Sequence, residues 1–300
     1  MNLLQFYITY PFRVRKQIRH HNRCANLLKP YVERYFVNRE TEFRFEAKKK
    51  FSNSKIIWQY WSGGTLQAPE MVQTCFKSVD QYASDYEIIR LNDSNFSEFI
   101  DIPDFILERR QEHNFNTAHF SDVLRLALLK VYGGIWLDAT ILLTGSLPSE
   151  LKANPFFMYQ RDMNESRKRY WERMFLYYFC WHPKFKVRIL NSIIASEKNN
   201  PIINALLENI LQFWKENRTA PHYFFFHILY DMVINDYMPN QNCEIKNDCD
   251  PHLLQSLILD GYPYLSYSEI MDTTNIHKLT YFKGKDLEKF NGLYQNQHLI

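Results

Sequence analysis

The stretch YGGIWLDATILLTG, residues 132 to 145, decides the fold of this 300-residue chain. Two glycines are followed by an apolar run of the kind that forms a buried strand. One carboxylate, Asp138, and one hydroxyl, Thr140, interrupt the run. A buried carboxylate without a partner is costly, so Asp138 must reach water, a cation or a hydrogen-bond donor. Side chains two apart on a strand point the same way, which predicts that both oxygens share one ligand.

Strand and helix patterns alternate around this run. Residues 55–61, 86–92 and 134–143 are rich in β-branched and aromatic side chains and predict strands. Apolar residues at helical spacing predict helices over 68–83 and 117–134, the second of which stops at the Gly-Gly pair. This alternation predicts an α/β fold with a mostly parallel sheet that helices cover on its faces.

The same patterns assign the rest of the chain. Two more strands are expected over 155–160 and 189–196, helices over 200–217 and 222–237, and short helices within 94–113. Residues 1–50 predict an N-terminal helical extension that Pro11 and Pro30 interrupt. Because no repeat or low-complexity linker divides the remainder, we expect one domain over residues 51–300.

The charge of the chain is nearly balanced. A net charge of +3 argues against nucleic-acid binding, which needs a clustered basic face. The segment RVRKQIRHHNR, residues 13–23, nevertheless holds five Lys or Arg side chains. It is either a solvated helix face or a contact with an anionic membrane surface, where each basic residue contributes about 1 kcal/mol.

Five cysteines without a C-x-x-C pair argue against a zinc cluster or a disulfide framework and favour a reducing compartment. The first residues, MNLLQFYITYPF, are a poor signal peptide. No stretch approaches the roughly 18 uncharged apolar residues of a membrane span. We therefore expect a cytoplasmic protein, at most peripheral at the inner face of the membrane.

Candidate ligand-binding residues lie at predicted strand ends and on one predicted helix. Trp61 is followed by Ser-Gly-Gly, which leaves an aromatic face beside bare backbone. Asp122 and Arg125, at i and i+3, either pair with each other or hold the hydroxyls of a sugar together. Asp138 and Thr140 either take part in a Mg²⁺ or Mn²⁺ site that substrate phosphates complete, or Asp138 caps a loop or pairs with a nearby Arg.

The motifs IIWQYWSGG and AHFSDVLRLALLKVYGGIWLDAT resemble the capsular polysaccharide synthesis proteins. These are bacterial sugar transferases related to glycosyltransferase family 32 and, more distantly, to the glucosylating clostridial toxins. The shared pattern is an early strand ending in Trp, then S-D-x-x-R on a helix, then G-G-hydrophobic-aromatic-hydrophobic-D-x-[D/T]. The resemblance is strong over 55–145, extends to about 285 and leaves out residues 1–50.

This resemblance implies a GT-A-like, Rossmann-like fold that binds a nucleotide-sugar donor, by default a UDP-sugar. Trp61 would pack on the nucleotide base. Ser121, Asp122 and Arg125 would hold the donor sugar or ribose, and Asp138 would be the first acid of a D-x-D metal motif.

Two points qualify the expected metal site. Position 140 is Thr, and a hydroxyl binds Mg²⁺ more weakly than a carboxylate does, so Mn²⁺ or Mg²⁺ would be held by Asp138 with help from Thr140. His277 and Lys278, in IHKLTY near the C-terminus, could close over the diphosphate or form an ordinary surface pair.

We therefore expect transfer of a sugar to a bacterial surface polysaccharide or lipo-oligosaccharide, with Asp138, Asp122 and Arg125 as catalytic residues and with retained anomeric configuration. An inverting reaction would need a base, for which Glu197 and Asp231 are candidates. The alternatives are a sugar-phosphate phosphotransferase and a catalytically degenerate assembly partner. A dehydrogenase or methyltransferase is disfavoured because no G-x-G-x-x-G follows the first strand.

Overall fold

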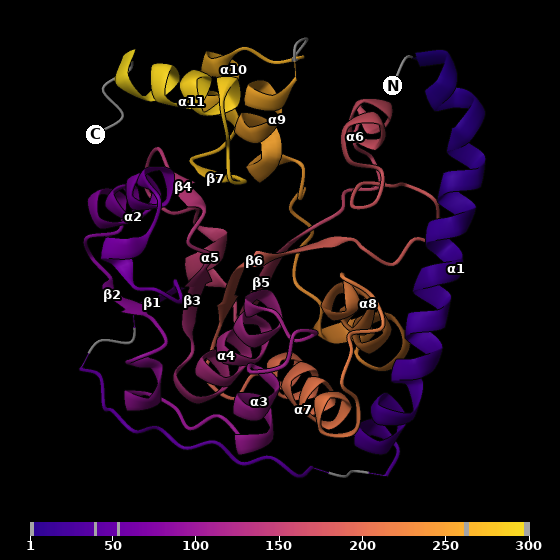
Figure 1. The fold of residues 1–300 in the computed structure, drawn as a ribbon, viewed down its shortest axis with the longest axis vertical. Helices are drawn as coiled ribbons and strands as arrows, with labels where there is room; N and C mark the ends of the chain where they lie inside the picture. Colours follow the sequence, from indigo (N-terminus) through magenta and orange to yellow (C-terminus); the bar gives the residue numbers. More distant parts are fainter. Residues whose placement is uncertain (1–2, 39–40, 53–54, 261–263, 297–300) are drawn as a thin grey trace.

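The computed structural model describes residues 3–38, 41–52, 55–260 and 264–296. A five-stranded sheet in the order β2-β1-β3-β6-β5 lies at the centre of the molecule (Figure 1). The strands are β1 (Ile56–Tyr60), β2 (Glu87–Leu91), β3 (Gly134–Leu137), β5 (Phe156–Gln160) and β6 (Ile189–Ser196). β1 pairs in parallel with β2 and β3, and β6 runs antiparallel to β3 and β5. Within this sheet only β6 is reversed, so the predicted α/β fold with a mostly parallel sheet is confirmed.

Alternating side chains give the sheet two buried faces. Ile57 and Ile135 pack in one apolar cluster with Val79 of helix α2 (Glu70–Tyr82). Their neighbours Trp58 and Trp136 pack in the other cluster, with α4 (Thr117–Tyr132) and α7 (Pro201–Glu216). Period-two alternation therefore buries both faces of the sheet, one against Val79 of α2 and the other against α4, α7 and the remaining buried side chains of α2.

The remaining helices surround this core. They are α1 (Leu3–Phe36), α3 (Asp104–Arg109), α5 (Glu150–Ala153), α6 (Lys168–Phe175), α8 (Phe225–Met232), α9 (Leu253–Leu259), α10 (Tyr267–Thr273) and α11 (Lys285–Asn296). The helix predicted over 222–237 is α8 followed by one π-helical turn. Figure 1 shows α9, α10 and α11 grouped above the sheet, on the same side as the strand β7 (Ile276–Lys278).

The strand predicted over 134–143 is two strands. β3 ends at Leu137, and the chain turns at Asp138, whose carbonyl accepts a hydrogen bond from the Ile141 N–H at 2.9 Å. β4 (Ile141–Leu143) then leaves the main sheet and pairs antiparallel with β7. The prediction that Asp138 and Thr140 share a strand face is therefore wrong, because both lie in the turn.

The two glycines before β3 are required by geometry. Gly133 and Gly134 have φ of +70° and +97°, which side-chain-bearing residues rarely adopt. A Cβ on Gly134 would lie 2.6 Å from the carbonyl oxygen of Ile56 in β1. The glycines let the end of α4 enter the sheet close against its neighbouring strand.

Helix α1 runs without a break through Pro11 and Pro30, so the predicted interruptions are wrong. A proline inside a helix costs about 3 kcal/mol. The buried side chains of Val14, Leu28 and Val32 pack α1 into the main core and offset this cost. α1 contacts α7 and α8, beside which it stands in Figure 1.

The helical prediction for residues 1–50 fails beyond α1, because residues 41–50 form no helix. The domain boundary at residue 50 stays a prediction. Within the described ranges, no helix combines the length and the apolar composition that crossing a membrane requires.

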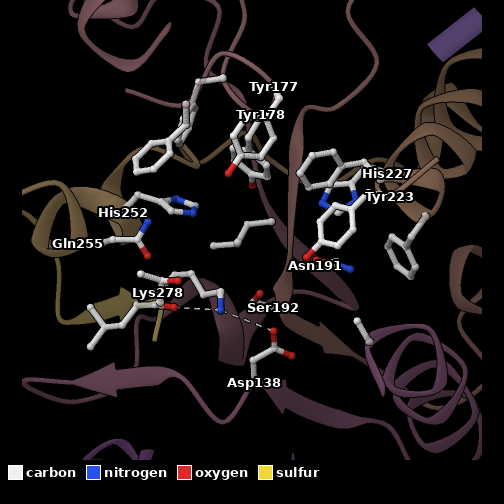
Figure 2. A pocket seen from close by; sticks show the side chains of 18 of the residues that line it. Asp138, Tyr177, Tyr178, Asn191, Ser192, Tyr223, His227, His252, Gln255 and Lys278 are labelled. Atoms are coloured by element: carbon white, nitrogen blue, oxygen red, sulfur yellow. Dashed lines mark hydrogen bonds and ion pairs between the residues drawn. The ribbon is translucent and has the colours of Figure 1, made fainter. Parts of the chain in front are cut away.

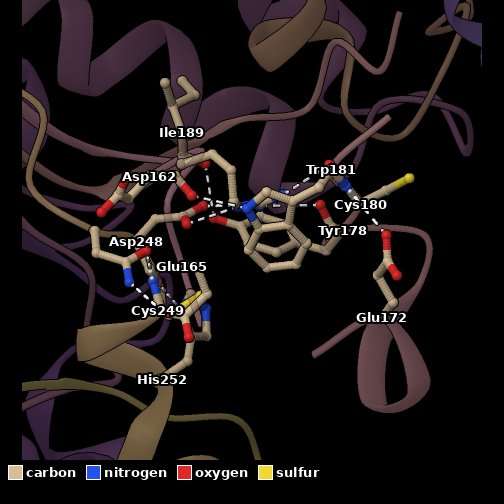
Figure 3. Close-up of polar contacts among 12 residues, drawn as sticks. Asp162, Glu165, Glu172, Tyr178, Cys180, Trp181, Ile189, Asp248, Cys249 and His252 are labelled. Atoms are coloured by element: carbon tan, nitrogen blue, oxygen red, sulfur yellow. Dashed lines mark hydrogen bonds and ion pairs between the residues drawn. The ribbon is translucent and has the colours of Figure 1, made fainter. Parts of the chain in front are cut away.

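A fully buried ion pair joins the sheet to the C-terminal part of the chain. Arg161, directly after β5, donates two hydrogen bonds of 2.8 Å to Asp248, and both side chains have 0% exposure. The guanidinium also donates to the carbonyls of Tyr178 and Cys180. Figure 3 shows Tyr178, Trp181 and Asp248 in this cluster. The pair fixes the start of the segment that continues through α9 to β7.

Asp248→Ala should destabilise the protein by about 3–5 kcal/mol, because the buried Arg161 then lacks a counter-charge. Chemical denaturation measures this loss. Asp85→Ala, which breaks an exposed pair with Lys55 at 3.0 Å, is the control and should cost at most about 1 kcal/mol. Equal losses in the two variants would contradict the anchoring role of the buried pair.

Candidate functional site

The candidate site lies where β1 and β3 end and α4 begins. Trp61 follows β1 and Asp138 follows β3, and parallel strands end at the same edge of a sheet. The first turns of α4 carry Ser121, Asp122 and Arg125 to this edge. Asn116 caps this helix by accepting a hydrogen bond from the His119 N–H. The structure therefore brings these residues, which the sequence patterns singled out, to one edge of the sheet.

Two cavities meet over this edge. The first, which we call the Trp61 cavity, has a volume of about 590 Å³, and Trp61, Ser121, Thr140 and Tyr281 contribute to its lining. The second, the His252 cavity, has a volume of about 460 Å³, and Asp122, Tyr177, Asn191, His227, His252 and Gln255 contribute to its lining. Arg125, Asp138, Tyr223 and Lys278 line both. Both volumes lie in the range of small-molecule sites.

Arg125 occupies the centre of the site and is 4% exposed. Its Nε and Nη2 donate to the backbone oxygen and Oγ of Ser121, at 3.1 and 3.0 Å, and Nη1 donates to the carbonyl of Asn191. Nη2 lies 3.5 Å from Oδ1 of Asp122 and 3.3 Å from Oδ1 of Asp138. Two ion pairs were predicted as alternatives to ligand binding: Asp122 with Arg125, and Asp138 with a nearby Arg. Both are present, and Arg125 is the cation in each.

Asp138 is an ionised anchor for two cations. Its Oδ1 accepts a hydrogen bond of 2.8 Å from Trp136 Nε1, and its Oδ2 lies 3.9 Å from Lys278 Nζ. Burial raises the pKa of Asp138, but the charges of Arg125 and Lys278, with hydrogen bonds from Ser192 and Trp136, lower it overall. The carboxylate therefore stays ionised at the junction of the two cavities.

Asp122 has the opposite electrostatic setting. Burial, together with the charge of Asp138, raises the pKa of Asp122 from 3.8 to about 7, although Arg125 and a 3.1 Å hydrogen bond from Asn191 Nδ2 act against the rise. Near neutral pH this carboxyl therefore exchanges a proton readily. It faces the His252 cavity, where it can donate to or accept from a hydroxyl.

Two predicted residues of the C-terminal strand behave differently. Lys278 reaches the junction of the cavities, and its Nζ donates to Thr140 Oγ1 at 2.5 Å. His277 is wrongly placed by the prediction. It is 0% exposed, lies outside both cavities and contacts Thr144 Oγ1 through Nε2 at 2.9 Å. Neighbours on a strand point to opposite faces, so β7 can present only one of the two to the site.

The other predicted side chains contribute to the Trp61 cavity. Trp61 is half-buried and packs edge-on against Tyr281, with ring centroids 5.9 Å apart. Ser121 and Thr140 line the same cavity. The two candidate bases lie elsewhere: Asp231 pairs with Lys186 at 2.7 Å, and neither it nor Glu197 lines the two cavities.

Sequence reasoning missed several residues of the His252 cavity. Asn191 and Ser192 interrupt an apolar strand, a signal that resembles the one at Asp138 and could have been used. Tyr223 and His227 carried no such signal, because they come from a helical segment distant in sequence. Figure 2 shows Tyr223, His227 and Asn191 on one side of the cavity, with Asp138 and Lys278 nearby.

The side chains present do not fit a divalent metal ion in the expected position. The position between Asp138 and Thr140 is held by the ammonium of Lys278. Nowhere in the described part of the chain do three or more His, Cys, Asp or Glu side chains gather in a way that could hold a metal. A hard cation prefers several oxygen ligands, and here two protein cations already surround the one ionised carboxylate.

Asp122→Asn should raise stability relative to the wild-type protein as the pH increases. The folded protein keeps the Asp122 proton up to about pH 7, whereas the unfolded chain releases it near pH 4, so the wild type loses stability between these values. Asn has no proton to lose. Melting temperatures across pH 4–8 measure the difference, and a difference that does not change with pH would contradict the raised pKa.

Comparison with known proteins places this geometry in a family. The family model described as "Capsular polysaccharide synthesis protein" matches residues 9–297, which includes most of α1. The matched range is wider than that of the motifs. The narrower relation to glycosyltransferase family 32 and a bacterial source stay predictions.

Individual relatives are more distant. The O-glycosyltransferase braB of Annulohypoxylon truncatum is 24% identical over 178 residues, which cover 56% of this chain and 40% of that protein. The glycosyltransferase afumC of Aspergillus fumigatus (strain CBS 144.89 / FGSC A1163 / CEA10) is 30% identical over 105 residues, or 32% of this chain and 27% of that protein. The chain thus spans less than half the length of these curated relatives.

Among solved structures, the PaToxG glycosyltransferase shares 14% identity and a TM-score of 0.38, with 93% of this chain and 95% of that chain covered. A similarity this low carries no argument about the site. The family model matches residues 9–297, nearly the whole chain, and on that ground the chain belongs to the capsular polysaccharide synthesis protein family.

Proposed function

We propose that this protein transfers a sugar from a nucleoside diphosphate donor to a hydroxyl of a glycan or glycolipid acceptor. The observation that carries the proposal is the fixed pair of cations, Arg125 and Lys278, where two ligand-sized cavities meet. The family and the names of the two relatives support the same reaction class.

The Trp61 cavity suits the nucleoside. Trp61 and Tyr281 offer aromatic surface at its wall, on which a base can stack. Uridine is the default base from the family resemblance. The diphosphate would then extend to the junction, where Arg125 and Lys278 lie.

The reaction needs positive charge at that junction. Breaking the bond between the anomeric carbon and the diphosphate oxygen leaves additional negative charge on the nucleoside diphosphate. Fixed cations stabilise this charge more strongly in the transition state than in the bound donor, which lowers the barrier. Asp138 serves by holding Arg125 and Lys278 in place.

The His252 cavity suits the transferred sugar and the acceptor. Asp122 can hydrogen-bond a hydroxyl of the transferred sugar. Tyr177 and Tyr223, which are 52% and 70% exposed, present rings at this cavity against which an acceptor sugar can pack. His227 adds a buried Nδ1 that has no hydrogen-bond partner within the described structure and can accept from or donate to a ligand.

We propose retention of the anomeric configuration, on the strength of the family resemblance. In that case the departing diphosphate can take the proton of the acceptor hydroxyl, and no separate base is needed. If the product instead shows inversion, Asp122 becomes the candidate base, since its raised pKa suits proton transfer near neutral pH.

Asp138→Asn should lower donor turnover by a factor of about 10² or more, because it releases the two cations without changing side-chain size. The assay is release of nucleoside diphosphate from a panel of UDP- and GDP-sugars. Asp231→Asn is the matched control: Asp231 is similarly buried and lysine-paired but lies outside the cavities, so turnover should not change.

Two other results would replace this proposal. A product heavier by one phosphate group would indicate the phosphotransferase alternative. Wild-type protein that releases no diphosphate from any donor would favour the assembly-partner alternative.

A peripheral membrane contact through residues 13–23 is a separate proposal. Arg15, Lys16, Arg19 and Arg23 are exposed on α1, and Ile8 and Phe12 expose 62% and 70% of their surface one or two turns earlier. Deleting residues 1–50 would remove core side chains, so point variants are the better test. Replacing the four basic residues by Gln should reduce co-sedimentation with anionic vesicles. Unchanged co-sedimentation would dismiss the contact.

A further inference from the structure

We infer that this site binds its nucleoside diphosphate without a divalent metal ion, because the ammonium of Lys278 occupies the place between Asp138 and Thr140. The inference rests on the proposed function and assigns Lys278 the role that the D-x-D resemblance assigns to a metal.

The position of Lys278 is defined by hydrogen bonds on the protein side. Its Nζ donates to Thr140 Oγ1 at 2.5 Å and to the carbonyl of Leu279 at 3.2 Å. An ammonium has three N–H donors, which leaves one for the cavity. Figure 2 shows the Lys278 ammonium near Asp138, with a dashed line between them. Phosphate oxygens that enter the junction can accept this remaining hydrogen bond.

The backbone around Lys278 holds it in register. Lys278 lies opposite Ile141 in the β4–β7 pair, and the Leu279 N–H donates to the carbonyl of Thr140 at 3.0 Å. The lysine therefore comes from a strand paired with the very turn that carries Asp138 and Thr140. A point charge held this way is preorganised, which is what electrostatic stabilisation of a leaving group requires.

The oxygens that a metal would need are already engaged. Asp138 Oδ1 accepts from Trp136 and faces Arg125, Oδ2 faces Lys278, and Thr140 Oγ1 accepts from Lys278. The other cavity carboxyl, Asp122, lies on the side of the His252 cavity and is directed at Arg125 and Asn191. A divalent ion would have to displace Lys278 and approach Arg125.

The chemical step balances without a metal. The bond between the anomeric carbon and the diphosphate oxygen breaks, and its electron pair goes to that oxygen. The acceptor hydroxyl oxygen bonds to the anomeric carbon, and its proton passes to the departing diphosphate. Lys278 and Arg125 take no part in this proton transfer and donate hydrogen bonds to the diphosphate oxygens.

Calorimetric binding of UDP and GDP, in EDTA and in Mn²⁺, tests the inference. The wild-type protein should bind its preferred nucleotide equally well in both. In EDTA, the affinity of Lys278→Met for the nucleotide should be about 10–100-fold lower, because the variant lacks one charged hydrogen bond to the phosphates. Mn²⁺ should restore part of the loss, because Asp138 and Thr140 are then available. Lys278→Arg should keep metal-independent binding.

Lys186→Met is the matched control, since Lys186 is as exposed as Lys278 (24% against 22%) and pairs with Asp231 away from the cavities. Its affinity should equal that of the wild type. Two results would overturn the inference and leave the proposed function standing. One is wild-type binding that disappears in EDTA and returns with Mn²⁺. The other is undiminished binding by Lys278→Met in EDTA. Absence of binding under every condition would refute the proposed function and the inference together.

Discussion

The burial of Arg125 is the constraint on which the rest of the site depends. A guanidinium that is 4% exposed must have its charge balanced and its N–H groups paired. Ser121 and Asn191 supply oxygens, and Asp122 and Asp138 supply charge. These partners come from α4, from β6 and from the turn after β3, so satisfying one side chain sets the relative positions of three elements. The two carboxylates that share it acquire opposite protonation tendencies, with Asp138 ionised and Asp122 titrating near neutral pH.

A second buried arginine carries the C-terminal part of the chain to this site. Arg161 pairs with Asp248, and from there the chain continues through α9 to β7, which pairs with β4 beside the Asp138 turn. Arg161 also binds the carbonyls of Tyr178 and Cys180, in the segment that lines the His252 cavity. A charge pair remote from the chemistry thus places both Lys278 and part of the cavity wall.

What could be predicted from the sequence is what depends on local spacing. The i, i+3 relation of Asp122 and Arg125 and the position of Trp61 after a strand follow from short-range geometry, and both proved correct. Three features depend instead on partners far along the chain. The turn at Asp138 depends on β7, and the burial of His277 depends on β4. The unbroken helix through Pro11 depends on α7 and α8. Tyr223 could not be assigned for the same reason, because only the folded chain brings it beside Asp138. The substitution of Thr for an acid at position 140 was visible, but its consequence was not, since the lysine that engages it lies 138 residues away.

The central claim is that the cations at the junction of the two cavities hold a nucleoside diphosphate. The structure of the complex with whichever of UDP or GDP binds better tests it most directly. The account predicts phosphate oxygens within hydrogen-bond distance of Arg125 and Lys278, and the base against Trp61 in its cavity. A nucleotide bound away from this junction, or with its phosphates turned out to solvent, would contradict it.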